Sequence, residues 1–281
     1  MRWGFHLSSL PDHDWQSIAL PLLNMGYRGV TIRANADWFC DDERVSKLLS
    51  ERLLHLRSIG LEVTLDADGR FLVDPWHAAV PRLARPEESS ARETLLHQLL
   101  DIAGRTDCSL ITFSVGDASS DELAEETIKR LAEAIARLIE HAERVGVTMA
   151  IKPVIGSAIE TASHFHRLRE WLPRSMLDTH ALGWAADIGV MARRGELPIG
   201  DRLARDRETL ACVYLSDIGA GEYGDCRFGC GELAVSRIVR SLEEWGYRAP
   251  LVLRCEGHSL AGLEIAKEAM NVVHDRDRSW G

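Results

Sequence analysis

Four side chains that can carry charge or exchange protons each follow a short apolar run in the second half of the sequence: Lys152, Asp187, Tyr214 and Arg254. A lysine and an arginine can hold substrate oxyanions and stabilise an enediolate, and Asp187 can act as the general base. Glu256 is an alternative base, and His258 or Tyr214 could return the proton. The pattern predicts a site that can hold oxyanions and transfer protons.

A second group of residues lies after other apolar runs or in the adjoining loops: His6, Arg70, Asp217, Trp38 and Trp76. We expect these residues, together with Arg254, to contact the substrate. Tryptophan rings can stack on the face of a sugar, although they can equally pack in a core. Any one of these residues could be a solvated loop residue or part of a salt bridge. Together they predict a binding site.

Eight short β-rich runs alternate with helical segments, which indicates parallel strands joined by crossover helices. The expected strands are Trp3 to Leu7, Gly29 to Ile32, Leu61 to Leu65, Leu110 to Phe113, Thr148 to Ile151, Trp184 to Asp187, Cys212 to Leu215 and Leu251 to Leu253. In such a barrel the residues just past each strand share one face. We therefore expect Lys152, Asp187, Tyr214 and Arg254 to lie within reach of one another.

The helical segments have recognisable ends. Glycine stops a helix just before a strand in MGYRGVTI, IGLEVTL, VGVTMAI and WGYRAPLVL. One helix is expected from about 14 to 25 with Pro21 inside it, and another before Gly146, with Ser119 and Glu122 as a capping box. Eight units and no glycine-rich dinucleotide fingerprint favour a single (β/α)₈ TIM barrel domain over residues 1–281.

Composition narrows the partners. The formal charge of −10 argues against nucleic acid, whose phosphates require a basic surface. The sequence has neither a membrane-length apolar run nor a signal peptide, and its six cysteines are scattered in a chain large enough to fold without disulfides. We expect a cytoplasmic protein with reduced thiols, a small-molecule substrate or anionic ligand, no membrane association and possible homo-oligomers.

Several segments resemble the sugar phosphate isomerases and epimerases, barrels similar to xylose isomerase and endonuclease IV: WGFHLSSLPD, LPLLNMGYRGVTI, GRFLVDP, LGWAADIG, VYLSD, FGCGEL and CEGHS. The resemblance covers nearly the whole sequence and implies a xylose isomerase-like TIM barrel acting on a sugar. It also implies a divalent metal held by two glutamates, an aspartate and a histidine of the later strands.

The metal-ligand pattern is broken in this sequence. Asp187 keeps the expected aspartate, but Lys152 and Arg254 replace the two glutamates, Tyr214 stands where a histidine is usual, and Val190 replaces the histidine of the sixth strand. Two fixed cations oppose a dication. We therefore predict no metal at the family position and no other cofactor, even if Asp178 and His180 are the sixth-strand pair.

Three interpretations remain open. The first is a metal-independent isomerase, epimerase or lyase, in which a lowered pKa could also let Lys152 form a Schiff base. The second is a non-catalytic barrel that binds a ligand or partner, with Lys152, Asp187 and Arg254 salt-bridged in the former metal pocket. The third is a metal enzyme with relocated ligands, drawn from His6, Asp66, Asp68, Asp217, Glu222, Glu256 and His258.

Overall fold

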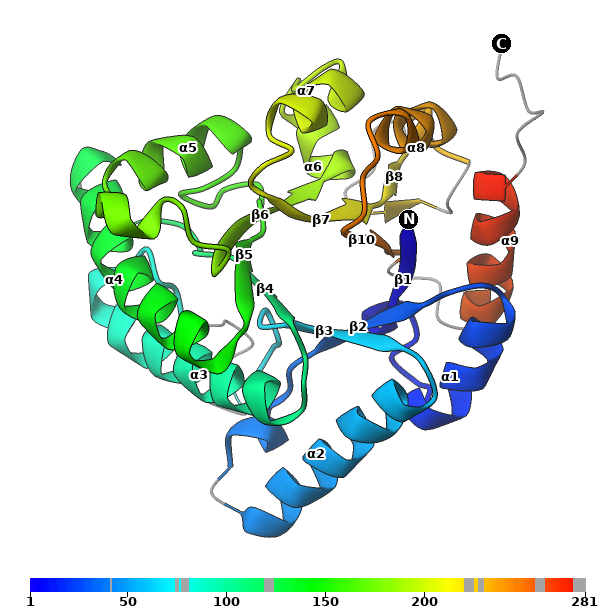
Figure 1. Cartoon of the computed structure of the whole chain (residues 1–281), viewed down its shortest axis with the longest axis horizontal. Helices are drawn as coiled ribbons and strands as arrows, with labels where there is room; N and C mark the ends of the chain where they lie inside the picture. Colours follow the sequence, from blue (N-terminus) through cyan, green and yellow to red (C-terminus); the bar gives the residue numbers. More distant parts are fainter. Residues whose placement is uncertain are drawn as a thin grey trace. The chain divides into compact units, whose positions relative to one another are not determined.

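A computed structural model describes residues 1–40, 42–73, 76, 81–118, 124–219, 225–226, 230–255 and 261–274. Eight strands form a closed barrel in the order β1-β10-β7-β6-β5-β4-β3-β2 (Figure 1). Their bounds are β1 Arg2–His6, β2 Gly29–Arg33, β3 Glu62–Asp66, β4 Leu110–Phe113, β5 Thr148–Ile151, β6 Leu182–Asp187, β7 Leu210–Leu215 and β10 Pro250–Leu253. The predicted (β/α)₈ barrel is confirmed.

All eight predicted strands are present. The largest differences are at the starts of β6 and β7, which begin at Leu182 and Leu210 rather than at Trp184 and Cys212. Both extensions add mostly apolar residues that continue the buried runs. A short antiparallel pair, β8 (Asp217–Ile218) and β9 (Asp225–Cys226), was not predicted.

The helices of the described residues are α1 Trp15–Asn24, α2 Glu43–Ser58, α3 Pro86–Arg105, α4 Ala124–Val145, α5 Ala162–Glu170, α6 Ile188–Arg193, α7 Ile199–Arg205, α8 Val235–Glu244 and α9 Gly262–His274, with the 3₁₀ turns η1 Leu7–Ser9, η2 Ala36–Phe39 and η3 Arg174–Met176. Asp14 caps α1 by accepting from the N–H groups of Gln16 and Ser17. The predicted capping box at Ser119 and Glu122 lies outside the described residues.

The predicted glycine stops are confirmed by the backbone. Gly146 follows α4 with a φ of 70°, and Gly26, Gly60 and Gly246 also have positive φ. Glycine adopts this left-handed conformation without the steric cost that a Cβ would bring. Each stop lets the chain turn at once from a helix into the next strand.

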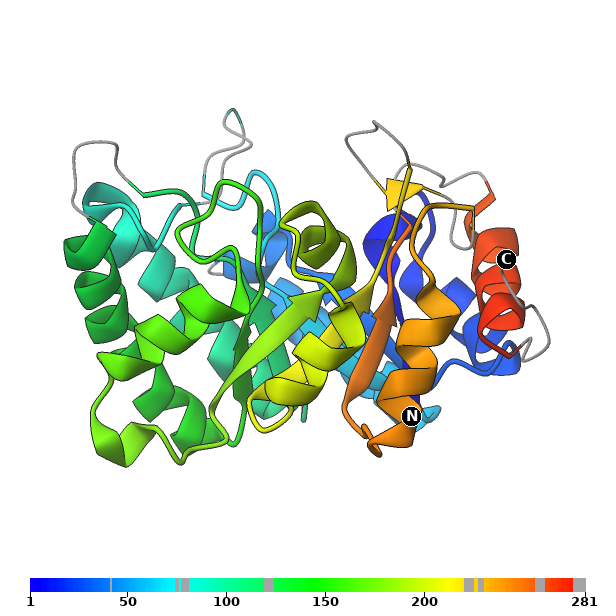
Figure 2. The same cartoon turned by 90° about the horizontal axis from the view of Figure 1, so that it is seen from above.

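The chain divides into two compact units. Unit 1 comprises Met1–Ile32, Leu56–Glu62 and Ala186–Gly281, and unit 2 comprises Arg33–His55 and Val63–Ala185. In unit 1, β10 pairs with both β1 and β7. In unit 2, β4 pairs with β3 and β5, and α3 lies alongside α4 (Figures 1 and 2). A single domain over residues 1–281 stays a prediction.

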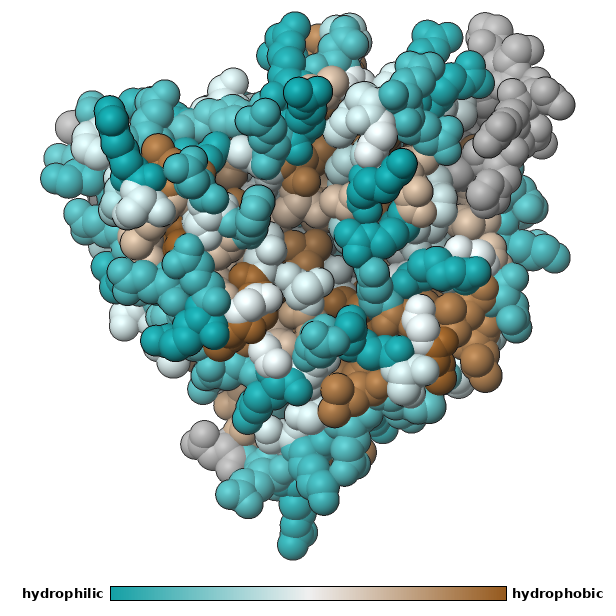
Figure 3. All heavy atoms as spheres, viewed as in Figure 1, coloured by the Kyte–Doolittle hydropathy of each residue, from teal (hydrophilic) through white to brown (hydrophobic). Residues whose placement is uncertain are grey.

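Each unit has its own apolar interior. Phe5, Leu22 and Leu253 are fully buried in unit 1, and Leu138 and Phe165 are fully buried in unit 2. Figure 3 shows hydrophilic side chains over much of one face, with hydrophobic residues exposed between them. Within the described residues, no helix combines the length and apolar character needed to span a bilayer.

Candidate functional site

Unit 2 carries a group of charged side chains where β2, β3 and β5 end, which we call the Lys152 cluster: Arg33, Asp66, Asp68, Arg92 and Lys152. The Lys152 ammonium lies 2.8 Å from Asp66 Oδ1 and 3.1 Å from Asp68 Oδ2. Arg33 Nε lies 3.2 Å from Asp66 Oδ2, and Arg92 lies 2.8 Å from Asp68 Oδ1. The five side chains therefore form one continuous run of ion pairs.

Backbone contacts fix the Lys152 cluster in place. Asp68 accepts from the Ser114 N–H at 3.0 Å with both carboxylate oxygens, so β4 orients it. Arg92 comes from α3, is 1% exposed, and donates to the carbonyl of Ala67 at 3.0 Å. The cluster is therefore a rigid part of unit 2 and not a set of solvated loop ends.

The surroundings of Lys152 decide its charge. Burial by itself would lower the pKa of Lys152, which is only 4% exposed, but the carboxylates of Asp66 and Asp68 outweigh burial and raise the pKa above its usual value. The direction is opposite to the lowered pKa that the Schiff-base option for Lys152 requires. A raised pKa favours the charged ammonium, and a charged ammonium is a poor Schiff-base nucleophile.

Unit 1 carries a second group, the Asp187 cluster: His6, Asp187, Tyr214, Ser216 and Arg254. Asp187 Oδ2 lies 3.0 Å from Arg254 Nη2. Asp187 Oδ1 accepts from the N–H groups of Gly189 and Val190, which caps α6, and from Ser216 Oγ at 3.1 Å. Both carboxylate oxygens are therefore engaged, and this arrangement does not favour Asp187 as the general base.

Aromatic rings support the charged pair of the Asp187 cluster. The Arg254 guanidinium carbon lies 5.9 Å from the centre of the Tyr214 ring. The centres of the His6 and Tyr214 rings are also 5.9 Å apart. His6 is buried, and its Nδ1 accepts from the Ser8 N–H at 3.2 Å. This contact leaves the proton of the neutral imidazole on Nε2, where it can be donated.

The structure thus brings together some of the predicted residues. Asp187, Tyr214 and Arg254 meet in unit 1, while Lys152 lies in unit 2. The predicted closeness of Lys152 to the other three stays a prediction. Glu256 and His258 lie outside the described residues, as does Glu222.

Asp217 has a structural task in the loop after β7. Its carboxylate accepts from the backbone N–H groups of Ile218, Gly231 and Leu233, at 3.0, 2.9 and 3.2 Å. Both oxygens hold the returning loop against the strand end. This use differs from the substrate contact that the sequence suggested, because strand-end position alone does not distinguish a loop anchor from a ligand contact.

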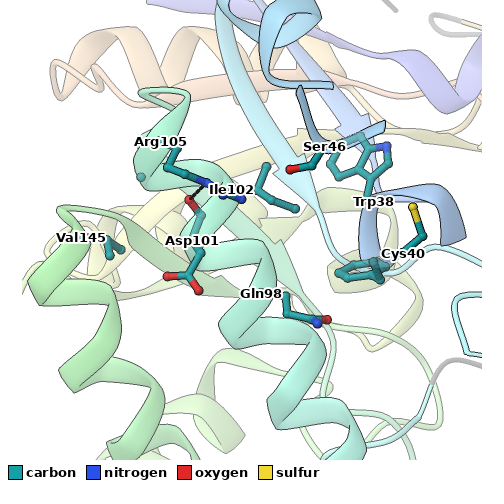
Figure 4. Close-up of a pocket in the computed structure, with 10 residues that line it drawn as sticks. Trp38, Cys40, Ser46, Gln98, Asp101, Ile102, Arg105 and Val145 are labelled. Atoms are coloured by element: carbon teal, nitrogen blue, oxygen red, sulfur yellow. Dashed lines mark hydrogen bonds between the residues drawn. The ribbon is translucent and has the colours of Figure 1, made fainter. Parts of the chain in front are cut away.

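Three further predicted contact residues are dispersed. Trp38 is buried and lines a pocket of about 460 Å³, whose opposite wall includes Gln98, Ile102 and Arg105 of α3 (Figure 4). Trp76 is 86% exposed, and Arg70 is also exposed. The sequence did not distinguish stacking on a sugar from packing in a core for any tryptophan. The structure packs Trp38 among the helices.

The implied metal does not fit these residues. Of the positions expected to bind it, Lys152, Tyr214 and Arg254 offer no anionic ligand, and Asp187 already receives three hydrogen bonds and an ion pair. Among relocated candidates, Asp66 and Asp68 face three cations. The part of the chain that the structure describes contains no group of three His, Cys, Asp or Glu side chains suited to a metal ion.

The fold and the strand-end sites define the protein as a (β/α)₈ barrel with clusters of polar residues at its strand ends. Sequence comparison agrees with this class. A family model described as a xylose isomerase-like TIM barrel matches residues 14–276. The chain belongs to this family. A search of curated protein sequences finds no match.

Solved structures share the fold at low identity. A D-psicose 3-epimerase from Clostridium cellulolyticum H10, bound to D-tagatose, is 14% identical, with a TM-score of 0.74 over 97% of this chain and 98% of that chain. A 3-keto-D-glucoside 4-epimerase from E. coli is 15% identical, with a TM-score of 0.72 over 97% and 98%. The IOLI protein with a bound zinc atom is 14% identical, with a TM-score of 0.71 over 97% and 95%.

Sequence reasoning missed one member of the Lys152 cluster and misjudged two. Asp66 and Asp68 were noted at a strand end but considered only as metal ligands. Arg92 was missed because it lies in a helix rather than after a strand. A signal was available: Arg92 is three and four residues before Leu95 and Leu96, so it lies on the apolar face of α3, where an unpaired charge would be costly.

Proposed function

We propose that this protein is an isomerase, epimerase or lyase that acts on a sugar, polyol or related acidic small molecule without the divalent metal of its family. One observation carries the proposal. Where the family would place a glutamate ligand, Lys152 supplies a buried ammonium whose charge is secured by Asp66 and Asp68. A fixed positive charge can stabilise a developing oxyanion, which is the electrostatic service that a metal otherwise provides.

The proposal gives each described residue a task. In unit 2, Lys152 is the residue that stabilises negative charge. In unit 1, Arg254 is oriented by Asp187 and the Tyr214 ring so that its guanidinium can bind an oxyanion. His6 donates from Nε2, because Ser8 occupies Nδ1. Because both carboxylate oxygens of Asp187 are already hydrogen-bonded or ion-paired, we assign the role of general base to Glu256. His258 or the Tyr214 hydroxyl then returns the proton.

A solvent-exchange experiment tests this function without knowledge of the substrate. The chelator-treated protein is incubated in D₂O with D-tagatose, D-fructose and 3-keto-D-glucosides, the compounds that its structural neighbours are named for or bind, and with carboxylated and phosphorylated sugars. Deuterium uptake next to a carbonyl is followed by NMR, because removal and return of that proton is the proposed step. We expect uptake with at least one compound and no dependence on added manganese or zinc.

Matched variants separate the roles of Lys152. Lys152→Met should abolish uptake, whereas Lys152→Arg should retain part of it, because arginine preserves the charge but cannot form a Schiff base. Lys47→Met removes a lysine that is 79% exposed in α2 and should match the unaltered protein. Uptake that requires a metal, or equal uptake in Lys152→Met, would contradict the proposal.

A specific observation favours a second candidate, a barrel that binds a ligand without transforming it. The carboxylates of the Lys152 cluster and of Asp187 are already paired with cations, as expected if ion pairs fill a former metal site. Saturable binding of one of the same compounds without deuterium uptake would support this candidate and reject the first.

The proposal also includes a cytoplasmic location and a small-molecule ligand. Among the described residues, Cys40, Cys108, Cys212, Cys230 and Cys255 are not in disulfides, which agrees with a reducing compartment. Localisation of a tagged full-length chain by cell fractionation tests this part.

A further inference from the structure

Unit 2 contains a groove, which we call the α3 groove, that shares no residue with the Lys152 cluster. It has a volume of about 460 Å³, within the range of small-ligand pockets, and only helix and turn residues line it (Figure 4). One wall comes from η2 and the start of α2: Trp38, Phe39, Cys40 and Ser46. The other wall comes from α3: Gln98, Asp101, Ile102 and Arg105. Gly104 and Val145 complete the lining.

Two opposite charges of the α3 groove lie one helical turn apart but do not pair with each other. Asp101 is held from α4, because its Oδ1 lies 2.8 Å from Nε2 of His141. Arg105 donates through Nε to the backbone carbonyl of Asp101 at 3.2 Å, and Figure 4 shows the two charged ends pointing in different directions. Within the described ranges of the chain, Arg105 forms no ion pair. Its two Nη groups can therefore bind an anionic group in the groove.

The rest of the lining combines hydrogen-bonding and apolar side chains. Neither Gln98 nor Ser46 has a side-chain hydrogen-bond partner in the part of the chain that is described. The half-buried Phe39, with Trp38 and Ile102, supplies an apolar surface. A hydrocarbon ligand would remove water from the polar side chains without replacing their hydrogen bonds, and an inorganic anion would leave the apolar surface unused. A ring that carries hydroxyl groups and a carboxylate matches the whole lining.

We propose that the α3 groove is a binding site for a sugar acid, a sugar ring that carries a carboxylate. Arg105 binds the carboxylate, for which a guanidinium offers two parallel hydrogen bonds. Gln98 and Ser46 bind ring hydroxyls, and one face of the ring covers Phe39 and the exposed edge of Trp38. The site is additional to the proposed catalytic residues, so its occupation does not depend on the proposed function.

The probe for the test is D-glucuronate, and Cys40 reports where it binds. Cys40 is exposed and lines the α3 groove, whereas Cys230 is exposed in unit 1. The full chain is alkylated with iodoacetamide, and the rate at each cysteine is followed by mass spectrometry of its peptides. We expect D-glucuronate to slow alkylation of Cys40 saturably and to leave Cys230 unaffected. D-Glucose, which lacks the carboxylate, and phenylacetate, which lacks the hydroxyls, should protect Cys40 only at much higher concentrations.

Variants of Arg105 test the contact that carries the proposal. Arg105→Gln should weaken protection by D-glucuronate about tenfold, and Arg105→Lys should weaken it less, because lysine keeps the charge but not the paired hydrogen bonds. Arg167→Gln, which removes an exposed arginine of α5, is the matched control and should behave like the unaltered protein. No protection of Cys40 at tens of millimolar D-glucuronate would overturn the inference. Equal protection in Arg105→Gln, or equal protection by phenylacetate, would overturn it too.

Discussion

Replacing Lys152 with methionine should destabilise the protein through the two carboxylates that it leaves behind. Lys152 Nζ lies 2.8 Å from Asp66 Oδ1 and 3.1 Å from Asp68 Oδ2, so it bridges the two carboxylates. Methionine has a similar length and no charge, so the substitution isolates the electrostatic contribution. Without the ammonium, both carboxylates lose a shared cation, at side chains that are 0% exposed for Asp66 and 16% exposed for Asp68.

The remaining partners set the size of the effect. Removing one member of a buried ion pair costs about 3–5 kcal/mol. Asp66 keeps Arg33 at 3.2 Å, and Asp68 keeps Arg92 at 2.8 Å and the Ser114 N–H. We therefore expect a loss near the lower end, about 3 kcal/mol of unfolding free energy. Adding Asp66→Asn to the variant removes the repulsion and should recover about 1–2 kcal/mol.

Urea unfolding followed by circular dichroism measures these differences. Lys47→Met is the control, because Lys47 is 79% exposed and its contact with Glu51 is 3.9 Å long, so its effect should stay within about 0.5 kcal/mol. If Lys152→Met is as stable as Lys47→Met, the Lys152 cluster does not hold its carboxylates as charged groups. The same conclusion holds if the losses of unfolding free energy caused by Asp66→Asn and Lys152→Met simply add in the double variant.

The other predictions concern separate features of the fold. Burial and the neighbouring His141 lower the pKa of His97 below its usual 6.5, so as the pH falls the unfolded chain protonates at this histidine before the folded chain does. The contribution of His97 to stability should therefore be complete above about pH 6.5 and be lost as the pH falls below that value. In unfolding midpoints measured from pH 5 to 8, His97→Gln should flatten this loss. Asp187→Ala removes the α6 cap and the carboxylate facing Arg254, and should cost about 3 kcal/mol in urea unfolding; a cost below 1 kcal/mol would refute this assignment. Gly146→Ala should cost only about 1 kcal/mol, because φ is 70° but, its chain neighbours aside, no described residue has an atom within 4 Å of the added Cβ; a much larger loss would indicate a clash that the structure lacks. Borohydride with a carbonyl substrate should leave no adduct on Lys152, because the raised pKa of Lys152 disfavours the neutral amine. Mass spectrometry showing such an adduct would contradict the raised pKa.

The sequence by itself determined the course of the chain. Local signals sufficed, because a helix stop such as Gly146 and an apolar run such as Thr148 to Ile151 are each encoded within a few residues. The alternation of these signals then restricts the fold to parallel strands with crossover helices. The sequence also identified which polar residues follow the strands, including Lys152, Asp187 and Arg254.

Only the tertiary structure decided which of these polar residues pair. Lys152 meets Asp66 and Asp68, which lie more than 80 residues away in sequence, and the helix residue Arg92 completes their contacts. These pairings raise the pKa of Lys152, which is opposite to the lowered pKa that the Schiff-base option requires. The physical reason is that strand and helix signals act over a few residues, whereas electrostatic energy depends on distances that exist only once the strands are side by side.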